Sequence, residues 1–421
     1  MSSSRTTRGA SLVVLCASLI AASVATSLAG CAGKSRRETK EEVAARLVEY
    51  DTFVRTQRDH FSQVMLSRLA SNYDRSRADG SRFTYDVLAI SAGGQYGAFA
   101  VGVLQGWRDE KFNGTDEQMP QFDVVTGVST GALIAPFAYL GKPEHIHRID
   151  QLYQEVDDRF VALRDLFFFL PWRVSFYDND KLVRRIETEM DDALLTQVRT
   201  ASDDHRLLLI GTTDIDLGRM RVWDMGKLAG AYSAAEDPRR FRKVMLASAA
   251  IPAAFPPVMI DKAMYVDGGV TQQAFVGLDR EQIEDVVREF RSQHPGAPAP
   301  TIRIWLIVNG SLDVPPESVP DEWVKVSIRS IDTMMKYSIR TTLRHLEFGV
   351  ETLSERLATK VEFRYICVPD TFPLPKTSEL FERKLMDALA AKGREMAREG
   401  THWRRNVQSV ELPGGDPAPM P

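Results

Sequence analysis

Short apolar runs recur along most of the chain and alternate with segments whose apolar residues return every three or four positions. The short runs are typical of buried strands, and the periodic segments are typical of amphipathic helices. The strands expected from this pattern are residues 85–90, 122–126, 206–212, 219–223, 264–267, 302–308 and 361–368. Apolar strands that alternate with helices predict an α/β fold with a largely parallel sheet covered on both faces.

Two longer segments have a helical pattern. The first runs to about Leu69, and the polar residues 70–82 that follow it are expected to form a loop. In the second, residues 324–357, apolar side chains follow steps of three and four without a break. This spacing predicts one long amphipathic helix, or two stacked end to end, that packs its apolar stripe on the sheet.

Composition limits the classes of function. The chain has 421 residues, of which 44% are hydrophobic and 26% charged, as in ordinary globular proteins with a sizeable core. Its net charge is −4, and no run of Lys and Arg resembles a polybasic arm. Nucleic acid is therefore not an expected partner.

The N-terminus has the features of a secretory signal. Arg5 and Arg8 precede an uncharged apolar stretch, residues 11–28, which ends in the tetrapeptide L-A-G-C at residues 28–31. This tetrapeptide resembles the lipobox of bacterial lipoproteins, which implies lipidation of Cys31 and cleavage just before it. An uncleaved transmembrane anchor is the alternative. With Ala32 after the cysteine, there is no retention signal of the aspartate type, so we expect a lipid anchor in the bacterial cell envelope, at the outer membrane if there is a second membrane.

Cysteine usage agrees with export. Cys16 would leave with the signal and Cys31 would carry lipid, so that Cys367 is the one remaining thiol. A single thiol cannot form an internal disulfide, and the exported domain must be held by its core.

A serine between two glycines follows the second expected strand. The sequence Gly127-Val128-Ser129-Thr130-Gly131 comes between a strand-like run and a helix-like run. In that context, a G-x-S-x-G turn exposes its serine as a nucleophile beside helix-terminal amides. The motif also occurs by chance as a tight turn without chemical role, so it needs further support.

Two other glycine-rich turns supply that support. Residues 91–97, S-A-G-G-Q-Y-G, also join a strand to a helix, and their amides can converge on one oxygen as an oxyanion hole requires. A phosphate-cradling loop is the alternative, although neither the G-K-[ST] ending nor the G-x-G-x-x-G spacing is present. Asp267 ends another expected strand and is followed by Gly268 and Gly269, after an upstream stretch A-S-A-A-I-P-A-A-F-P-P at residues 247–257.

These motifs occur in one order over residues 86–270, and together they resemble the patatin-like phospholipase family. The resemblance implies a three-layer α/β/α fold and a Ser–Asp dyad that hydrolyses lipid acyl esters. Ser129 would be the nucleophile and Asp267 the base. The implied oxyanion-hole amides are those of Gly93, Gly94 and Gln95, and the implied motif glycines are Gly97, Gly127, Gly131, Gly268 and Gly269.

The chain departs from the family pattern in its glycine-rich loop. The usual G-G-G-x-R-G has Ala92 in place of its first glycine and Tyr96 in place of its arginine. Alanine keeps its amide but does not readily adopt positive φ. The missing arginine removes a fixed cation from the neighbourhood of the oxyanion hole.

Histidine and aspartate residues offer alternative catalytic and metal-binding sites. A Ser–Asp–His triad would need a histidine after Asp267, and His294, His345 and His402 are available, the first two being expected on the surface. His145 and His147 are more typical of a solvated helix start than of a metal pair, and Asp214 and Asp216 of a hairpin turn. We therefore expect no metal and no cofactor.

Six aromatic residues lie within residues 167–177 (FFFLPWRVSFY). They are expected to be buried in the core, or else to line an acyl-chain pocket or touch lipid.

The sequence thus predicts a membrane-anchored serine carboxylic-ester hydrolase that acts on lipid or phospholipid acyl esters. The alternatives are a Ser–Asp–His esterase and a non-catalytic surface lipoprotein that uses the fold for binding. The expected organisation is a signal peptide at 1–30, a tether and helix at 31–82, a catalytic core at 83–276, the rest of the α/β domain with the long helix at 277–405, and a disordered tail at 406–421.

Overall fold

The computed structural model describes residues 38–109, 118–155, 162–163, 177–178, 180–230, 238–314, 316–373 and 381–406. The chain divides into two compact units, residues 1–44 and 45–421. The described part of the first unit begins helix α2 (Lys40–Asp79). Thr39 and Glu42 cap this helix reciprocally, because each backbone amide donates to the other side chain, at 2.7 and 3.2 Å.

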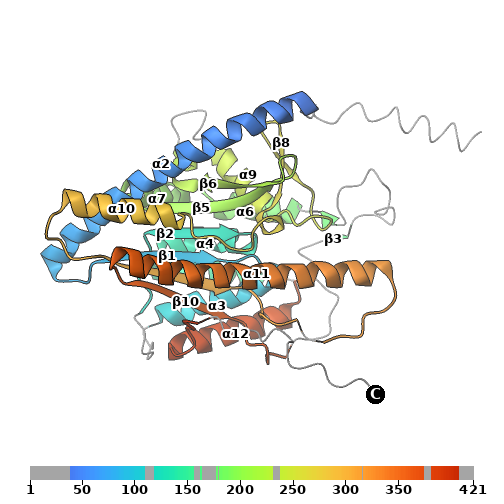
Figure 1. The fold of residues 1–421 in the computed structure, drawn as a ribbon. Coiled ribbons are helices and arrows are strands. Elements are labelled where there is room, and N and C mark those ends of the chain that lie inside the picture. The colour runs from blue at the N-terminus through green and yellow to red at the C-terminus, as the bar shows by residue number, and fades with distance from the viewer. Residues whose placement is uncertain are drawn as a thin grey trace, which may run out of the picture. The chain divides into compact units, whose positions relative to one another are not determined.

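The second unit is built around one sheet of eight strands (Figure 1). Seven of them follow the order β10-β9-β1-β2-β5-β8-β7, and β6 also pairs with β5. The strands are β1 (Thr84–Ile90), β2 (Val124–Val128), β5 (Leu207–Asp214), β6 (Arg219–Asp224), β7 (Val258–Ile260), β8 (Ala263–Asp267), β9 (Thr301–Val308) and β10 (Val361–Cys367). The strands from β10 to β5 are mutually parallel, whereas β6 and β8 run antiparallel to β5. The predicted, largely parallel sheet is confirmed.

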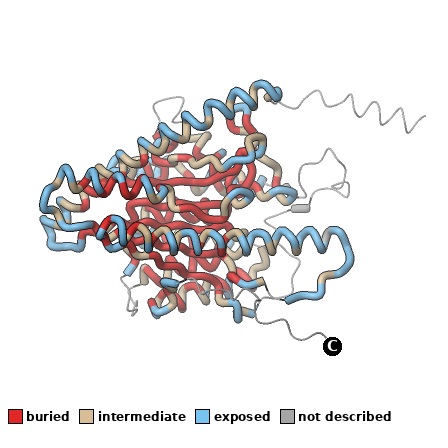
Figure 2. Tube along the Cα trace, in the orientation of Figure 1, coloured by how far each residue is buried: buried red, intermediate tan, exposed pale blue. Residues whose placement is uncertain are grey.

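Helices cover both faces of this sheet, so the fold has three layers. Neighbouring strand residues alternate between two apolar cores: Leu88 and Ile90 belong to one, and Val87 and Ala89 to the other. The first core is completed by α3 (Gly97–Arg108), α4 (Thr130–Leu140), α5 (Pro143–Glu155), α6 (Asp180–Glu189), α7 (Asp192–Asp203), α8 (Met225–Leu228), α9 (Pro238–Ser248) and α12 (Arg383–Glu399). The second is completed by α2, α10 (Arg280–Gln293) and α11 (Trp323–Leu357). Figure 2 shows the buried strands between these layers.

Short elements complete the described chain. They are the 3₁₀ turns η1 (Gly94–Tyr96) and η3 (Gly268–Val270) and the antiparallel pair β3 (Ala162–Leu163) and β4 (Tyr177–Asp178).

The loop predicted at residues 70–82 is wrong over most of its length, because α2 continues to Asp79. The sequence pattern does not reveal this part of the helix, because several of its contacts are made by polar side chains. The Asn72 amide donates to Thr84 O at 3.0 Å and to Asp123 Oδ1 at 3.1 Å. Tyr73 also packs edge-on against Phe290 of α10. Hydrogen bonds of this kind leave no apolar periodicity to read.

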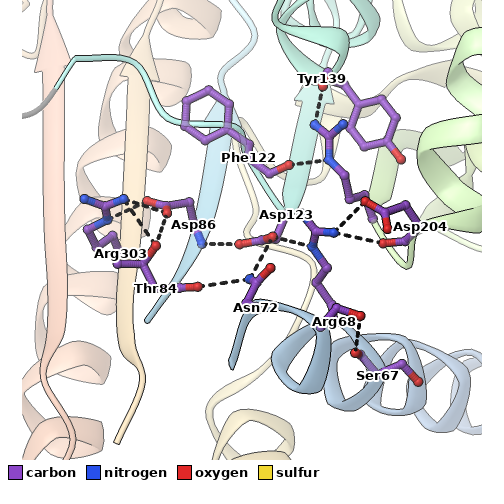
Figure 3. A network of polar contacts seen from close by, with 12 residues as sticks. Ser67, Arg68, Asn72, Thr84, Asp86, Phe122, Asp123, Tyr139, Asp204 and Arg303 are labelled. Atoms are coloured by element: carbon purple, nitrogen blue, oxygen red, sulfur yellow. Dashed lines mark hydrogen bonds and ion pairs between the residues drawn. The ribbon is translucent and has the colours of Figure 1, made fainter. Parts of the chain in front are cut away.

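A buried polar network ties α2 to the amino edge of the sheet (Figure 3). Asp123 accepts from Arg68 Nε at 2.6 Å and from the Asp86 amide at 2.7 Å. Asp86 in turn accepts both Nε and Nη2 of Arg303, at 2.6 and 2.7 Å, and the Trp305 indole at 3.1 Å. Burial raises the pKa of Asp86, and Arg303 opposes that rise. The network joins α2, β1 and β9 to the start of β2.

Helix α11 is one continuous helix, but only its second half packs as predicted. Ile339, Leu343, Val350, Leu353 and Leu357 are buried in the second core. The preceding members of the same stripe are exposed, as in Ile328 (61%) and Ile331 (56%). The helix has 35 residues and is therefore about 52 Å long, roughly twice the length of the strands that it covers.

The network predicts that a nearly isosteric substitution of Asp123 strongly lowers the stability of the fold. Asp123→Asn removes the buried charge partner of Arg68 and leaves it only the exposed carboxylate of Asp204, so it should lower the free energy of unfolding by about 3 kcal/mol. As a control, Asp203→Asn removes the partner of Arg199 in an exposed i,i+4 pair and should cost less than about 0.5 kcal/mol. Urea unfolding of both variants measures this difference, and equal losses would contradict the role given to Asp123.

Candidate active site

Ser129 occupies a strained turn between β2 and α4. Its backbone has φ 56° and ψ −124°, a conformation that a non-glycine residue rarely adopts. The predicted turn at Gly127–Gly131 is shorter than expected, because Gly127 and Val128 complete the strand and α4 already begins at Thr130. Strain of this kind persists only where the surroundings enforce it, and it is common at functional sites.

The two glycines of the motif are required by close backbone packing. A Cβ on Gly127 would lie 2.5 Å from the carbonyl oxygen of Gly131. A Cβ on Gly131 would lie 2.3 Å from Ile90 O and 2.7 Å from Ser91 O. The first turn of α4 therefore touches both its own strand and the end of β1.

Ser248 holds the turn from the other side. Its hydroxyl accepts the Ser129 amide at 3.0 Å and donates to Gly211 O of β5 at 2.7 Å. The residue belongs to the A-S-x-A-x-P stretch, but the sequence did not suggest this role for it. In the same stretch, Ala250 O accepts the amide of Asp267 at 3.0 Å. The stretch thus positions both members of the candidate dyad.

The register of the sheet brings Asp267 to the level of Ser129. Val128, just before the nucleophile, is paired with Gly211 of β5. The next residue of β5, Thr212, is paired with Asp267 of the antiparallel strand β8. Both functional side chains therefore lie at the carboxyl edge of the parallel strands.

The Asp267 carboxyl is buried and incompletely hydrogen-bonded. Its Oδ1 accepts the Gly269 amide at 2.7 Å. Its Oδ2 is buried, and no described residue meets it with hydrogen-bond geometry. The Ser129 hydroxyl is nevertheless close enough to stabilise the carboxylate. The two groups are therefore close together without a formed hydrogen bond, because catalytic hydrogen bonds are often long before substrate binds.

Burial raises the pKa of Asp267 from 3.8 to about 7. The Ser129 hydroxyl and the Gly269 amide lower this pKa, because both stabilise the charged form of the carboxyl group. A carboxyl group with this pKa is half ionised near neutral pH, which is the condition that suits a general base.

The glycine-rich loop follows β1 and forms η1 at the start of α3. A Cβ on Gly93 would lie 2.3 Å from Asn309 O, and Gly94 has a φ of +54°. Neither amide donates to another backbone carbonyl among the described residues outside regular elements. Ala92 does not adopt positive φ, so that alanine is accommodated at this position without strain.

Asn309 and Gln273 fix the position of this loop. The Asn309 amide donates to Ser91 Oγ, and its side-chain Nδ2 to Ser91 O, both at 2.8 Å. Gln273 O accepts the Ala92 amide at 2.9 Å, and Gln273 Nε2 donates to Gly269 O at 2.8 Å. Gln273 thereby links the loop to the turn after Asp267. No motif in the sequence marked either residue.

The other motif glycines permit close packing around the same site. A Cβ on Gly97 would lie 2.1 Å from Thr130 Oγ1, and one on Gly268 would lie 2.4 Å from Gly211 O. Gln95 Oε1 accepts the Glu382 amide at 2.9 Å, which joins the loop to the start of α12.

A narrow apolar cavity of about 100 Å³ opens beside Ser129. Gly94 of the loop and Thr130 also line it, and burial raises the pKa of the nearby Tyr153 phenol. Most of the remaining lining is hydrocarbon or aromatic: Leu133, Phe137, Ile149, Leu152, Leu182, Ile186, Met190, Ala249, Ile251, Phe255, Phe381 and Met386.

A second cavity, of about 400 Å³, lies against Tyr96 of the same loop. Arg340 lines it together with Asp313, to which its guanidinium is paired. Tyr96, which replaces the usual arginine, therefore lines a cavity that is also lined by the guanidinium of Arg340.

The alternative histidine bases lie elsewhere. His294 stacks on Phe290 with ring centroids 4.6 Å apart, and His402 pairs with Glu399 at 2.7 Å. His345 is exposed on α11, as expected. Within the described ranges, no contact joins any of the three to Asp267.

The candidate metal residues form no cluster. His145 and His147 lie at the start of α5, as predicted, and His147 is exposed. His145 is buried and meets Gln197 Oε1 at 3.1 Å, so its expected exposure to solvent is wrong. Asp214 ends β5 in a hairpin to β6, as predicted, and accepts the Leu217 amide at 3.0 Å. In the part of the chain that the structure describes, no group of three or more potential ligands is arranged around one point.

Cys31 with its lipobox, the aromatic residues 167–176 and the tail from residue 407 lie outside the described residues. Among the helices that are described, none is both long and apolar enough to cross a membrane.

The chain is similar to known proteins over part of its length. The family model for Patatin-like phospholipase matches residues 88–277. An uncharacterized protein of Acanthamoeba polyphaga mimivirus is 25% identical over 229 residues, which cover 54% of this chain and 72% of that protein. The crystal structure of VipD from Legionella pneumophila aligns with 77% of this chain and 68% of its own, at 12% identity and a TM-score of 0.34.

The matched segment contains the glycine-rich loop, the strained turn at Ser129 and the buried carboxyl of Asp267. This match supports lipid hydrolysis as the activity, and residues 88–277 of the chain form a patatin-like phospholipase domain by their match to the family model.

Proposed function

We propose that this protein hydrolyses lipid acyl esters with a Ser129–Asp267 dyad and is held at a membrane by lipid on Cys31. The observation that carries the catalytic part is the buried Asp267 carboxyl, whose pKa is raised to about 7 beside the strained Ser129. An acid that only stabilised the fold would be paired, as Asp86 is with Arg303. Asp267 has no cation partner among the described residues.

The reaction follows from these positions. The Asp267 carboxylate accepts the Ser129 proton as Oγ attacks the ester carbonyl. The amides of Gly93, Gly94 and Gln95 stabilise the oxyanion that forms. When the intermediate collapses, the alcohol leaves with the proton from Asp267, and the acyl group stays on Ser129. Asp267 then takes a proton from water, whose oxygen attacks the acyl-enzyme. When this second intermediate collapses, Ser129 Oγ leaves with that proton and the fatty acid is released, which restores the Ser129 hydroxyl and the Asp267 carboxylate. None of these steps requires a cofactor.

The apolar cavity favours a long acyl chain over a polar substrate. Dry cavities of this scale, lined by Leu, Ile and Phe, accept hydrocarbon groups. The lining residues Leu133 and Phe137 belong to the helix that begins at Ser129, so a chain bound there would have its ester near Oγ. Phospholipids and other long-chain esters are the proposed substrates.

Replacement of either member of the dyad should abolish most of the activity. Asp267→Asn keeps the shape of the side chain but cannot accept a proton, so kcat/KM for ester hydrolysis should fall on the order of 10³-fold or more, as for Ser129→Ala. The double variant should lose little beyond either single variant, because the two residues act as one unit. Rates on a panel of lipid esters, with labelling of Ser129 by a fluorophosphonate, measure this.

Histidine variants separate the dyad from the alternatives. His294→Ala and His345→Ala should retain most of the activity. If one of them is inactive while Asp267→Asn is folded and active, that histidine is the base instead of Asp267. If Ser129→Ala and wild type are equally inactive on every ester while both are folded, the protein is a binding lipoprotein and the catalytic proposal is wrong.

The pKa of Asp267 predicts the pH dependence of the reaction and of stability. The base must be ionised, so kcat/KM should rise with pH and reach half its maximum near about pH 7, not near 3.8. Because this pKa is higher in the folded state than in the unfolded state, the folded protein binds more protons between pH 3.8 and about pH 7. The wild-type protein therefore loses stability as the pH rises through this range. Asp267→Asn should therefore be more stable than wild type above about pH 7, on the order of a few kcal/mol. A midpoint near 4 would contradict the buried, raised carboxyl.

Anchoring is tested at Cys31. Because L-A-G-C follows a basic and then an apolar segment, Cys31→Ala should block lipidation and leave the leader uncleaved. Intact-mass measurement of wild type and variant from the same host detects both changes. Outer-membrane placement is proposed for a host with two membranes, and fractionation of wild type tests it. An unchanged mass in the variant would contradict lipidation at Cys31.

A further inference from the structure

Exposed large apolar side chains are concentrated in a few places. Eight of the twelve such residues in the described chain lie on α11. These eight are Trp323, Val326, Ile328, Ile331, Met334, Met335, Tyr337 and Phe348, and the other four are Leu47, Val48, Ile215 and Val270. Single exposed apolar residues are normal on a protein surface, but a cluster on one helix usually marks a contact surface.

The exposed half of α11 extends past the edge of the sheet at which Ser129 lies. Among the described side chains of this helix, the first buried apolar one is Ile339, and residues 323–338 before it span about 24 Å. Figures 1 and 2 show this half beyond the ends of the strands, with its surface exposed. Asp332 is near enough to Tyr96 of the oxyanion loop to raise its pKa, in addition to burial, and Tyr337 lines the same cavity as Tyr96.

The remaining exposed apolar residues lie at the same edge. Ile215 directly follows the carboxyl end of β5, and Val270 ends the turn that follows Asp267. Leu47 and Val48 directly follow Arg46, which is paired with Asp214. Phe348 is the exception, because it lies within the half of α11 that covers the sheet. We call the other eleven residues the apolar end.

Charges on the exposed half of α11 are turned away from the apolar side. At about 100° per residue, Lys325, Arg329, Asp332 and Lys336 fall within roughly a quarter of the helix circumference. Arg329 contacts Glu317, and Lys336 contacts Asp332. Apart from apolar residues, the rest of the circumference over 323–338 carries only Ser and Thr.

The charge of the helix distinguishes between two occupants of this surface. Residues 323–348 contain five Lys or Arg and two Asp or Glu, a net charge of +3, and two of the cations, Arg329 and Arg340, also contact Glu317 and Asp313 outside this span. A second copy of the chain packed on the same face would bring two such helices together. An anionic bilayer would attract the helix and would accept its apolar side, with Trp323 suited to the interface.

We propose that the apolar end docks on the surface of an anionic lipid bilayer, with the exposed half of α11 entering the interface and the Ser129 site facing the lipid. The biological reason for such docking rests on the proposed lipid hydrolysis. The docking goes beyond that function, because it assigns a membrane-contact surface that is independent of Cys31. It also accounts for a helix twice as long as the sheet that it covers.

Fluorescence of Trp323 tests the docking without the reaction. Full-length protein carrying Ser129→Ala is mixed with vesicles of phosphatidylcholine and phosphatidylglycerol whose acyl chains carry bromine, which quenches tryptophan on contact. Trp323 is 80% exposed, whereas Trp107, Trp223, Trp305 and Trp403 are buried. Trp172, which lies outside the described residues, is replaced by Phe in every protein so that it does not contribute to the signal. We expect quenching that disappears in Trp323→Phe and weakens when phosphatidylglycerol is omitted or salt is added.

Charge substitutions on the same helix supply matched variants. Ile331→Glu with Met334→Glu places two carboxylates on the apolar side of the exposed half and should abolish the quenching of Trp323. Phe348→Glu is the control, because it is similarly exposed on α11 but lies over the sheet, and it should leave quenching unchanged. All of these residues are exposed, so the variants should unfold like the parent protein. Every protein carries the same N-terminus, so that lipid or leader there contributes equally.

Three results would overturn the proposal: no quenching of Trp323 by brominated lipid, equal quenching in the Ile331→Glu, Met334→Glu variant, or loss of quenching in Phe348→Glu. A concentration-dependent dimer in sedimentation that the double substitution abolishes, without quenching, would assign the surface to a second copy. Hydrolysis of long-chain lipid esters dispersed in detergent is measured separately with Ser129 intact. If none of these esters is cleaved but quenching is seen, lipid hydrolysis fails while docking stands. If they are cleaved without quenching, the docking alone is wrong.

Discussion

The candidate site depends on a contact between backbones, in which the first turn of α4 lies directly against the end of β1. Any side chain at Gly131 would collide with the carbonyl oxygens of Ile90 and Ser91. This contact places the strained Ser129 beside the glycine-rich loop that follows β1. Ser129 and the amides proposed to stabilise the oxyanion are thereby held close by main-chain geometry, which does not relax when side chains move.

Two buried carboxyl groups show how the two edges of the sheet differ. At the amino edge, Asp86 is bonded by Arg303 and Trp305, and its charge is compensated. At the carboxyl edge, Asp267 is buried with one amide donor and without a cation among the described residues, so its pKa is raised to about 7. A paired charge fixes the fold, whereas an unpaired one costs stability and gains basicity. The network in Figure 3 is thus a structural counterpart to the site at the opposite edge.

The two long helices show where sequence patterns mislead. The end of α2 was assigned to a loop because its contacts are made by polar side chains such as Asn72, which carry no apolar period. The stripe on α11 is regular over its whole length, yet the sheet is only long enough to bury the part from Ile339 onward. Periodicity therefore predicts which side of a helix is apolar, but not how much of that side meets a core.

The sequence by itself determined the strands, the three-layer class through its family resemblance, and the likeness of Ser129, Asp267 and the glycine-rich loop to a hydrolytic site. These are local properties: a strand, a turn or a run of glycines is specified by neighbouring residues. Only the tertiary structure decided that Ser248, Asn309 and Gln273 position the site, because they reach it from segments distant in the chain. It also decided the pKa of Asp267 and the exposure of half of α11, since burial depends on everything that packs around a residue and on the finite length of the sheet.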